Sequence, residues 1–196
     1  MLRSEMLALF SNSFFFDIWV YFSDLFCRLV EEADDVLGAR QFITYEDLGK
    51  LNYTGLVMKE TLRLHPSVPS FSRVIDKDDE LAGHFIPAGT LINPLPYVLH
   101  RNPKYWNDPE KFDPERFSAQ RDEEDTGFHR YAYFPFSLGP RHCIGQMFAE
   151  FEGKVLIARF VKSFKFKLVP GQDFGYEDLK TTLSPKDRIR CTLTLR

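Results

Sequence analysis

The feature that most constrains this chain is a short loop, FSLGPRHCIG, which spans residues 136–145 and sets one cysteine between glycines. Residues 145–164 follow with apolar side chains at helical spacing, so Cys143 is expected directly before a helix. Free backbone N–H groups and the positive end of a helix dipole stabilise a thiolate at such a position. The loop therefore predicts a cysteine that acts as a ligand or as a nucleophile.

The neighbours of this cysteine favour the ligand. A nucleophilic thiolate needs a base within hydrogen-bond reach, and His142 is adjacent in sequence, where side chains generally diverge. Gly139 and Gly145 leave the backbone open to a flat, bulky group, and Arg141 offers a forked cation to a carboxylate. Haem is planar, carries propionates and is held by a thiolate in one class of oxygen-activating proteins. We therefore expect Cys143 to be the axial ligand of a haem iron.

Composition limits the classes of partner and of site. The 196-residue chain has a net charge of −3 and a pI of about 6.0, which excludes nucleic acid as the expected partner because phosphate binding needs a strongly positive surface. Its cysteines, Cys27, Cys143 and Cys191, form no CxxC pair, so neither a disulfide framework nor a structural zinc site is expected. This sparse set is typical of a reducing compartment. The 20 phenylalanines predict a ring-packed interior or an apolar pocket.

Residues 44–65 predict two helices. Thr44 and Asp47 form a capping-box-like start, apolar residues then recur at helical spacing, and Pro66 ends the pattern. We expect a short helix followed by a longer one, with the break at residues 52–55.

The rest of the chain predicts short strands around irregular segments. Residues 80–100 alternate around a Pro-Ala-Gly turn at residues 87–89, which is typical of a hairpin. Residues 100–135 show no sustained period, so we expect a long loop with at most one short helix. The tail predicts two paired antiparallel strands, in FKFKLVP and RIRCTLTLR. The helix after the cysteine is expected to bury one stripe of side chains: Met147, Phe148, Phe151, Val155, Leu156 and Phe160. Together these elements predict a fold that is mainly α with small β-sheets (α+β).

The first 30 residues are a divergent, aromatic-rich segment. Residues 6–27 are long enough to suggest a membrane span, but they contain Asp17 and Asp24. A packed amphipathic helix is favoured over an anchor, and Glu5 argues against a secretory signal.

At this point three motifs resemble one family. FSLGPRHCIG matches the haem-ligand signature F-x-x-G-x-R-x-C-x-G of the cytochrome P450 superfamily at every fixed position. Two further segments follow the family's order: residues 60–63, ETLR, resemble its E-x-x-R helix, and residues 114–117, PERF, resemble its P-E-R-F element. The resemblance implies that residues 31–196 are the haem-binding, C-terminal part of a cytochrome P450 fold, present incompletely.

The resemblance also implies roles for individual residues. It makes Cys143 the axial thiolate and metal ligand of haem b, and it assigns no catalytic residue. The implied cofactor-binding residues are Phe136, Gly139, Arg141, Cys143, Gly145 and Arg73. The implied structural network is Glu60, Arg63 and Arg116, in which one carboxylate shared by two guanidiniums would hold the ligand loop. The implied substrate-pocket residues are Val68, Pro69, Ser70, Phe71, Thr182 and Leu183. For Arg73, an ordinary surface charge is the alternative.

Within the superfamily, residues 136–155 together with KLVPGQDFG and the final CTL most resemble cholesterol 24-hydroxylase and its animal relatives. This implies an O2-dependent hydroxylation of a sterol or other lipophilic small molecule. It also implies electrons from NADPH-cytochrome P450 reductase and a location on the cytosolic face of the endoplasmic reticulum membrane. A positive bias after the cysteine fits an acidic redox partner or, equally, a solvated helix face: Lys154, Arg159, Lys162, Lys165 and Lys167.

The chain also departs from the family pattern. The distal helix motif A-G-x-D/E-T-T and the W-x-x-x-R haem contact have no match in this sequence. We therefore expect a C-terminal fragment of a monooxygenase. The alternatives are a haem-binding remnant without turnover and a structural protein with an inert buried cysteine. The three ordered motifs disfavour the last.

Overall fold

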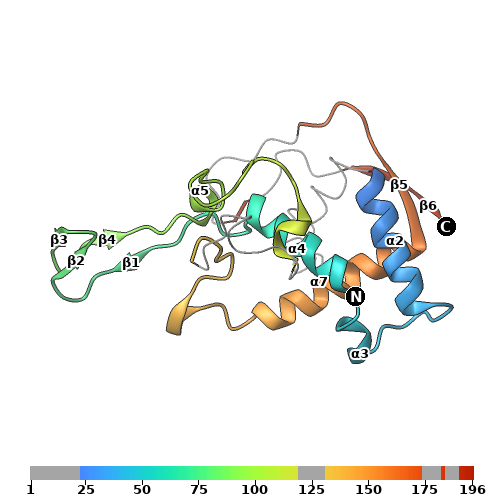
Figure 1. Ribbon diagram of the computed structural model, residues 1–196, viewed down its shortest axis with the longest axis horizontal. Coiled ribbons are helices and arrows are strands. Elements are labelled where there is room, and N and C mark those ends of the chain that lie inside the picture. The colour runs from blue at the N-terminus through green and yellow to red at the C-terminus, as the bar shows by residue number, and fades with distance from the viewer. Residues whose placement is uncertain (1–22, 119–130, 174–181, 184–189) are drawn as a thin grey trace.

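The structure is a computed structural model that describes residues 23–118, 131–173, 182–183 and 190–196 (Figure 1). The elements are α2 (Ser23–Leu37), α3 (Tyr45–Leu48), α4 (Asn52–Leu64), β1 (Arg73–Val74), β2 (Asp79–Leu81), β3 (His84–Ile86), β4 (Leu91–Ile92), α5 (Pro96–Leu99), the 3-10 helices η1 (Pro114–Phe117) and η2 (Gly139–Arg141), α7 (Gln146–Ser163), β5 (Phe164–Leu168) and β6 (Cys191–Leu195). The prediction of a mainly α fold with small β-sheets is confirmed.

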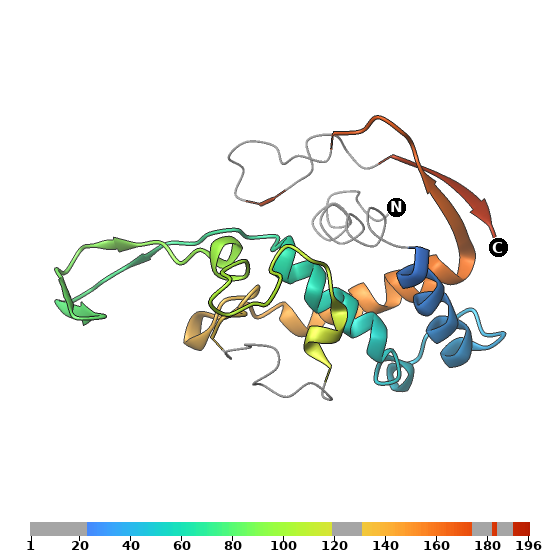
Figure 2. The same ribbon diagram turned by 45° about the horizontal axis from the view of Figure 1, so that its top comes forward.

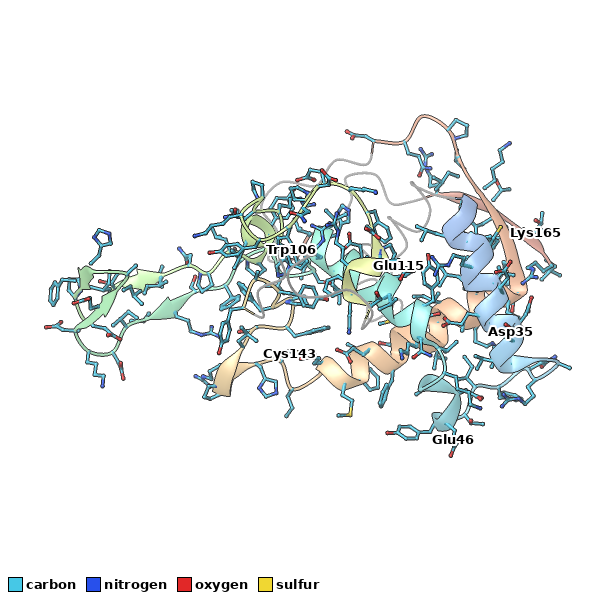
Figure 3. The ribbon with its side chains drawn as sticks, in the orientation of Figure 1. Asp35, Glu46, Trp106, Glu115, Cys143 and Lys165 are labelled. Atoms are coloured by element: carbon cyan, nitrogen blue, oxygen red, sulfur yellow. The ribbon has the colours of Figure 1, made fainter. Side chains whose placement is uncertain are left out.

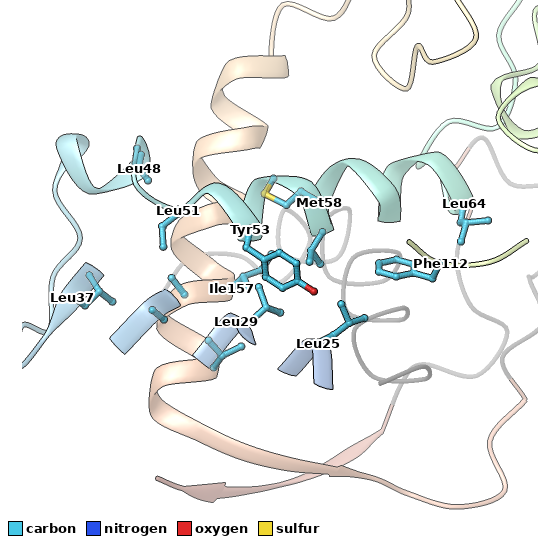
Figure 4. Close-up of a cluster of buried hydrophobic side chains, with 14 residues drawn as sticks. Leu25, Leu29, Leu37, Leu48, Leu51, Tyr53, Met58, Leu64, Phe112 and Ile157 are labelled. Carbon is cyan, nitrogen blue, oxygen red and sulfur yellow. The ribbon is translucent and has the colours of Figure 1, made fainter. Parts of the chain in front are cut away.

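The core lies where α2, α4 and α7 pack together (Figure 4). Helix α2 has apolar residues four apart, so Leu25, Leu29, Ala33 and Leu37 share one face, and all four are buried. Ile157 of α7 joins them with 1% of its surface exposed. Burial of this apolar surface is the main force that fixes α4 against α7.

Helix α2 runs continuously through the expected division between residues 30 and 31. Residues 1–22, which hold most of the predicted N-terminal helix, lie outside the described residues. Among the described helices, none combines the length and the apolar character needed to cross a membrane.

The break before α4 was predicted too far along the chain. Thr44 N and its hydroxyl both contact Asp47 Oδ2, at 3.0 and 3.1 Å, as the capping box predicts, but the helix that begins there ends at residue 48. Helix α4 already begins at Asn52. The reason is a tertiary cap: Glu32 of α2 accepts bonds from the backbone N–H groups of residues 53 and 54, at 2.6 and 2.8 Å. No local pattern reveals a cap that comes from another helix.

The hairpin was predicted with the wrong turn. Strands β2 and β3 pair antiparallel, Leu81 opposite His84, so the chain reverses at Ala82 and Gly83 rather than at residues 87–89. Both turn residues have positive φ, 50° and 81°, as a two-residue hairpin turn requires. Residues 87–89 instead lead into β4, which pairs with β1. The two short sheets extend away from the helices (Figures 1 and 2).

Helix α7 forms as predicted, and Phe151 and Val155 of the predicted stripe pack partly buried against the core, but the fully buried residues of α7 are others. Its buried residues are Ala149, Gly153, Ile157, Ala158 and Val161. Met147 and Phe148 are instead 66% and 63% exposed. Small residues at i and i+4 let α7 approach its neighbours closely, and this requirement outweighs side-chain size in choosing the buried face.

The remaining predictions concern the long loop and the tail. Strands β5 and β6 pair antiparallel, Phe164 opposite Leu195, which confirms the predicted tail. The predicted loop of residues 100–135 contains η1 in its described part, and residues 119–130 lie outside the described residues.

Candidate functional site

The cysteine loop is closed by a backbone hydrogen bond. Cys143 N donates to Phe136 O at 2.9 Å, and Gln146 N at the start of α7 donates to Cys143 O at 3.3 Å. Ser137 and Gly139 both have positive φ, 64° and 75°, so the chain turns sharply between these bonds. The loop thus presents Cys143, which is exposed, at the N-terminal end of α7 (Figure 3).

The two glycines of the loop differ in their physical role. A Cβ at Gly139 would meet nothing within 4 Å, so the positive φ is what selects glycine there. Gly145 has an ordinary φ of −83°, and a Cβ there would lie 3.7 Å from Cys143 Sγ. Glycine at residue 145 therefore keeps the space beside the sulfur open.

Several apolar residues close to Cys143 in the sequence are exposed. Four of them have large side chains that are at least 48% exposed: Leu138, Ile144, Met147 and Phe148. Arg141 is also exposed and has no hydrogen bond or ion pair among the residues that the structure describes. An open thiol, apolar neighbours and a free guanidinium fit a flat apolar ligand that carries a carboxylate, and haem is such a ligand.

His142 is engaged elsewhere. Its ring Nδ1 lies 2.9 Å from Gly139 O, which can only accept, so Nδ1 donates. This agrees with the expectation that His142 is not paired with Cys143 as a catalytic base.

The structure brings Glu60, Arg63 and Arg116 together in the interior. Arg63 Nε and Nη2 donate to the two carboxylate oxygens of Glu60 at 2.7 and 2.9 Å, a bidentate pair with both side chains fully buried. Arg116 Nε reaches Glu60 Oε1 at 3.3 Å. The backbone N–H of Asp113 donates to the same oxygen at 2.8 Å. A carboxylate in the interior is therefore surrounded by donors, as its burial demands.

The remaining guanidinium donors hold backbone carbonyls. Arg63 Nη1 donates to the carbonyls of His100 and Pro109, at 2.8 and 2.7 Å. Arg116 Nη2 donates to the carbonyls of Asp108 and Lys111, at 2.8 and 3.2 Å. The network therefore fixes the path of the irregular segment that leads from α5 to η1.

The predicted pocket residues come from two segments that meet. Leu183 N donates to Ser67 O at 3.0 Å, which places residues 182–183 beside the start of residues 68–71. Phe71 packs edge-on against Phe134, with ring centroids 6.2 Å apart, so this segment also contacts the residues just before the cysteine loop.

Arg73 lies on exposed strand β1. Its guanidinium is 4.7 Å from the ring centroid of Phe71, and its Nη1 donates to Ser72 O at 3.0 Å. It has no carboxylate partner among the described residues, so it is available to a propionate.

A cavity of about 870 Å³ lies between α4, the segment before Cys143 and the first turns of α7. Val68 and Phe71, predicted to face substrate, are not among its lining residues. Most of the charged groups on its wall already have partners. Arg28 Nη2 donates to Glu115 at 2.7 Å, and Lys154 Nζ donates to Leu48 O at 2.8 Å.

The positive bias after the cysteine is smaller than the sequence indicates. Besides Lys154, whose pKa burial lowers, Lys162 is engaged at the surface: its Nζ lies 3.1 Å from Asp34 Oδ1 and 2.6 Å from Gly38 O. The cations left exposed are Arg159, Lys165 and Lys167.

One residue of the site escaped prediction altogether. His100 is fully buried, and its ring lies between Arg63 and Phe134, with Nδ1 3.2 Å from Arg63 O and Nε2 accepting from Phe134 N at 3.0 Å. Burial lowers the pKa of His100 to about 4. A lone histidine within a charged loop carries no spacing signal, so only the three-dimensional structure reveals it.

An exposed cysteine at a helix N-terminus with exposed apolar neighbours in the sequence, in a chain that also contains a buried Glu-Arg-Arg network, is a combination suited to a haem-thiolate protein. Comparison with known proteins identifies the family. The family described as Cytochrome P450 matches residues 23–192, and the chain belongs to the cytochrome P450 family.

Individual relatives cover most of the chain. It is 50% identical over 138 residues to Cytochrome P450 4V2 of Rattus norvegicus, covering 70% of this chain and 26% of that protein. It is 44% identical over 147 residues to Cytochrome P450 4B1 of Homo sapiens, covering 74% and 28%. It is 38% identical over 156 residues to Cytochrome P450 3A6 of Oryctolagus cuniculus, covering 80% and 30%. The chain therefore spans less than a third of the length of these relatives, and their names lend no support to the expected likeness to cholesterol 24-hydroxylase.

Proposed function

We propose that this chain forms the haem-thiolate part of an oxygen-dependent monooxygenase, with Cys143 as the axial ligand of haem b. The observation that carries the proposal is the exposed Cys143 at the N-terminus of α7, with exposed apolar side chains before and after it in the sequence. Bound haem would supply oxygen activation, which a thiolate ligand favours by donating electron density.

The other residues of the site hold and shield the cofactor. Arg141 and Arg73 have guanidinium groups without carboxylate partners among the described residues, so each is proposed to pair with a propionate. Phe136 is partly buried, lies at the base of the loop and is proposed to cover the sulfur. The glycines are proposed to keep the loop turned and the sulfur accessible.

The network of Glu60, Arg63 and Arg116 is proposed to be structural. It lies in the interior, each partner carries several short hydrogen bonds, and its guanidiniums bind backbone carbonyls rather than facing solvent. Its role would be to hold the ligand loop in a fixed position relative to α4.

The substrate is proposed to be a lipophilic small molecule, with Val68, Pro69, Ser70, Phe71, Thr182 and Leu183 on the wall that faces it. The hydrogen bond between Leu183 N and Ser67 O supports the proposal that the two segments form one wall of the pocket. A sterol is the member of this class that resemblance to cholesterol 24-hydroxylase indicates. O2 and electrons from NADPH-cytochrome P450 reductase complete the proposed reaction, at the cytosolic face of the endoplasmic reticulum membrane. Docking of that reductase would use the exposed cations Arg159, Lys165 and Lys167.

The test is a carbon monoxide difference spectrum of the reduced chain after reconstitution with haem, beside Cys143→Ala and, as a matched control, Cys191→Ala. A thiolate-type Soret band that persists in Cys191→Ala and disappears in Cys143→Ala is the expected result. A spectrum unchanged by Cys143→Ala, or no haem uptake by the original chain, would reject the proposal.

The substrate class is tested separately by titrating the reconstituted chain with cholesterol and with a straight-chain fatty acid. A shift of the Soret band with cholesterol alone supports the sterol assignment. A shift with the fatty acid alone would assign another apolar substrate. Haem binding without a shift for either ligand would favour a haem-binding chain without turnover.

A further inference from the structure

His100 joins the buried network to the segment that leads to the cysteine. It follows α5 and is fully buried. Arg63 of α4 lies 37 residues earlier and Phe134 lies 34 residues later, yet both are hydrogen-bonded to it. A buried polar side chain with two partners so distant in sequence fixes two segments relative to each other.

Arg63 and His100 are bonded in both directions. Arg63 Nη1 donates to His100 O at 2.8 Å, and His100 Nδ1 lies 3.2 Å from Arg63 O. The side chain of each residue thus binds the carbonyl of the other. Because Arg63 also holds both oxygens of Glu60, His100 is attached directly to the buried ion pair.

The partners of the ring define its tautomer. Phe134 N can only donate, so Nε2, at 3.0 Å, must accept and carry no proton. The ring proton then resides on Nδ1 and is donated to Arg63 O. His100 is therefore neutral, and this single tautomer satisfies both partners.

Aromatic packing holds the ring in this orientation. Tyr133 stacks on His100 with ring centroids 5.3 Å apart and planes at 30°, and Phe134 meets it edge-on at 5.5 Å. The Tyr133 hydroxyl also donates to Lys59 O of α4 at 3.1 Å. The segment just before the cysteine loop is thus attached to α4 directly by Tyr133 and indirectly, through His100, by Phe134.

A short series of backbone bonds leads from Phe134 to the cysteine. Phe134 O accepts from Ser137 N at 3.0 Å, and Phe136 O accepts from Cys143 N at 2.9 Å. Ser137, which has a positive φ, lies between these bonds. A non-glycine residue keeps this strained conformation only when neighbouring contacts hold it. The anchor on the α4 side is the bond from Phe134 N to His100.

We propose that His100, as the neutral Nδ1–H tautomer, is a positioning residue that fixes the loop bearing Cys143 against the buried Glu60 and Arg63 pair. The proposal rests on the proposed function for its relevance to haem. The two bonds of the ring are needed together: one holds it to α4, and the other holds the loop.

A positive charge on the His100 ring would disrupt these contacts. A protonated ring would lose its acceptor at Nε2 and face the cations of Arg63 and Arg101, with Glu60 as the nearby carboxylate and Tyr133 stacked on one side. Burial and these cations lower the pKa of His100, which agrees with a ring that stays neutral at physiological pH.

The test measures amide hydrogen exchange in the full haem-free chain. His100→Phe keeps an aromatic ring but removes both hydrogen bonds, His100→Gln keeps a donor and an acceptor on one side chain, and His84→Phe is the matched control on exposed β3. In His100→Phe we expect the amides of residues 134–143 to exchange at least about tenfold faster, with amides of α2 and α7 unchanged. In His100→Gln and His84→Phe we expect exchange within about threefold of the original chain.

Several outcomes would overturn the proposal. The first is that exchange at residues 134–143 does not change in His100→Phe. The second is that exchange in His100→Phe accelerates by the same factor throughout α2, α4 and α7. The third is that these residues exchange as fast in His100→Gln as in His100→Phe. If His100→Phe does not fold, the His100→Gln result decides, because Gln shares only the two hydrogen-bonding ends with His.

A second readout uses the haem-loaded chain. We expect His100→Phe to convert part of the thiolate-type Soret band to the band of a haem that lacks its thiolate ligand, whereas His100→Gln should keep the original band. Equal spectra for all three chains would overturn the link to haem. Failure of the original chain to take up haem would reject the proposed function instead, while the exchange experiment would still decide the role of His100.

Discussion

Glu60 and Arg116 meet in the interior although 56 residues separate them, with Arg116 Nε 3.3 Å from Glu60 Oε1. The same oxygen accepts from Arg63 Nη2 at 2.9 Å and from the backbone N–H of Asp113 at 2.8 Å. All three groups donate, so this buried oxygen acts only as an acceptor. This relationship ties α4 to η1, and η1 is followed by the segment that leads to the cysteine loop.

Replacement of that carboxylate is the first prediction. Glu60→Gln keeps the shape but places an amide NH2 beside two guanidiniums, so two buried cations lose their counter-ion. We expect the free energy of unfolding to fall by about 3–5 kcal/mol in urea titrations of the haem-free chain. Glu110→Gln is the control: Glu110 also pairs with an arginine, Arg101, but its side chain is 73% exposed. We expect its effect to stay below about 1 kcal/mol. Equal losses for the two variants would contradict a structural role for Glu60.

The second prediction separates the two glycines of the loop. Gly139 has a φ of 75°, so Gly139→Ala forces an L side chain into the left-handed region and should lower the free energy of unfolding by about 1–2 kcal/mol. Gly145 has an ordinary φ, so Gly145→Ala should leave that free energy within about 0.5 kcal/mol but place a methyl group in van der Waals contact with Cys143 Sγ, where it should weaken haem uptake. Urea titration and haem titration of both variants distinguish the two effects. Equal changes in unfolding free energy and in haem uptake for the two variants would contradict this assignment of separate roles.

The third prediction concerns pH. Burial lowers the folded-state pKa of His100 to about 4, while an unfolded histidine titrates near 6.5. Between these values the unfolded state binds a proton that the folded state does not, so the free energy of unfolding must fall as the pH falls from about 6.5 to 4. The shift corresponds to a loss of about 3 kcal/mol at pH 4 relative to pH 7. His100→Gln should remove this part of the slope.

Urea titrations at three pH values across that window, on the original chain and on His100→Gln, provide the measurement. The Arg40 guanidinium holds the pKa of Asp47 well below its usual range, so stability from Asp47 is lost only as the pH falls below the ordinary carboxyl range. It therefore contributes little between pH 6.5 and 4. Parallel pH curves for the two chains would mean that the pKa of His100 is not lowered in the folded state.

The sequence was most informative where local patterns and chemistry coincide. The helical period after Cys143 predicted α7, and the alternation in the tail predicted the pairing of β5 with β6. The motifs also pointed to three residues that the structure brings together, Glu60, Arg63 and Arg116. In each case the signal is a short-range pattern or a fixed order of residue types.

Tertiary contacts account for what the sequence did not predict. The start of α4 is set by Glu32, which lies 21 residues before the nearest N–H that it caps. The buried face of α7 is set by close approach to α2 and α4, which favours Ala149 and Gly153 over Met147 and Phe148. His100 has no motif, because its partners lie in two other segments of the chain. Each depends on distances between segments that no local window contains.

The last prediction tests Arg141 as a ligand of the cofactor rather than as part of the fold. Arg141 is exposed and makes no hydrogen bond or ion pair within the described residues, so Arg141→Gln should change the free energy of unfolding of the haem-free chain by less than about 0.5 kcal/mol. Loss of a charge-assisted bond to a propionate should nevertheless weaken haem binding by about tenfold or more, measured by titration of the Soret band. Arg159→Gln, on the exposed surface of α7, is the control and should leave haem affinity unchanged. Haem affinity that falls equally in both variants would indicate a general effect of surface charge, and affinity unchanged in Arg141→Gln would remove Arg141 from the proposed site.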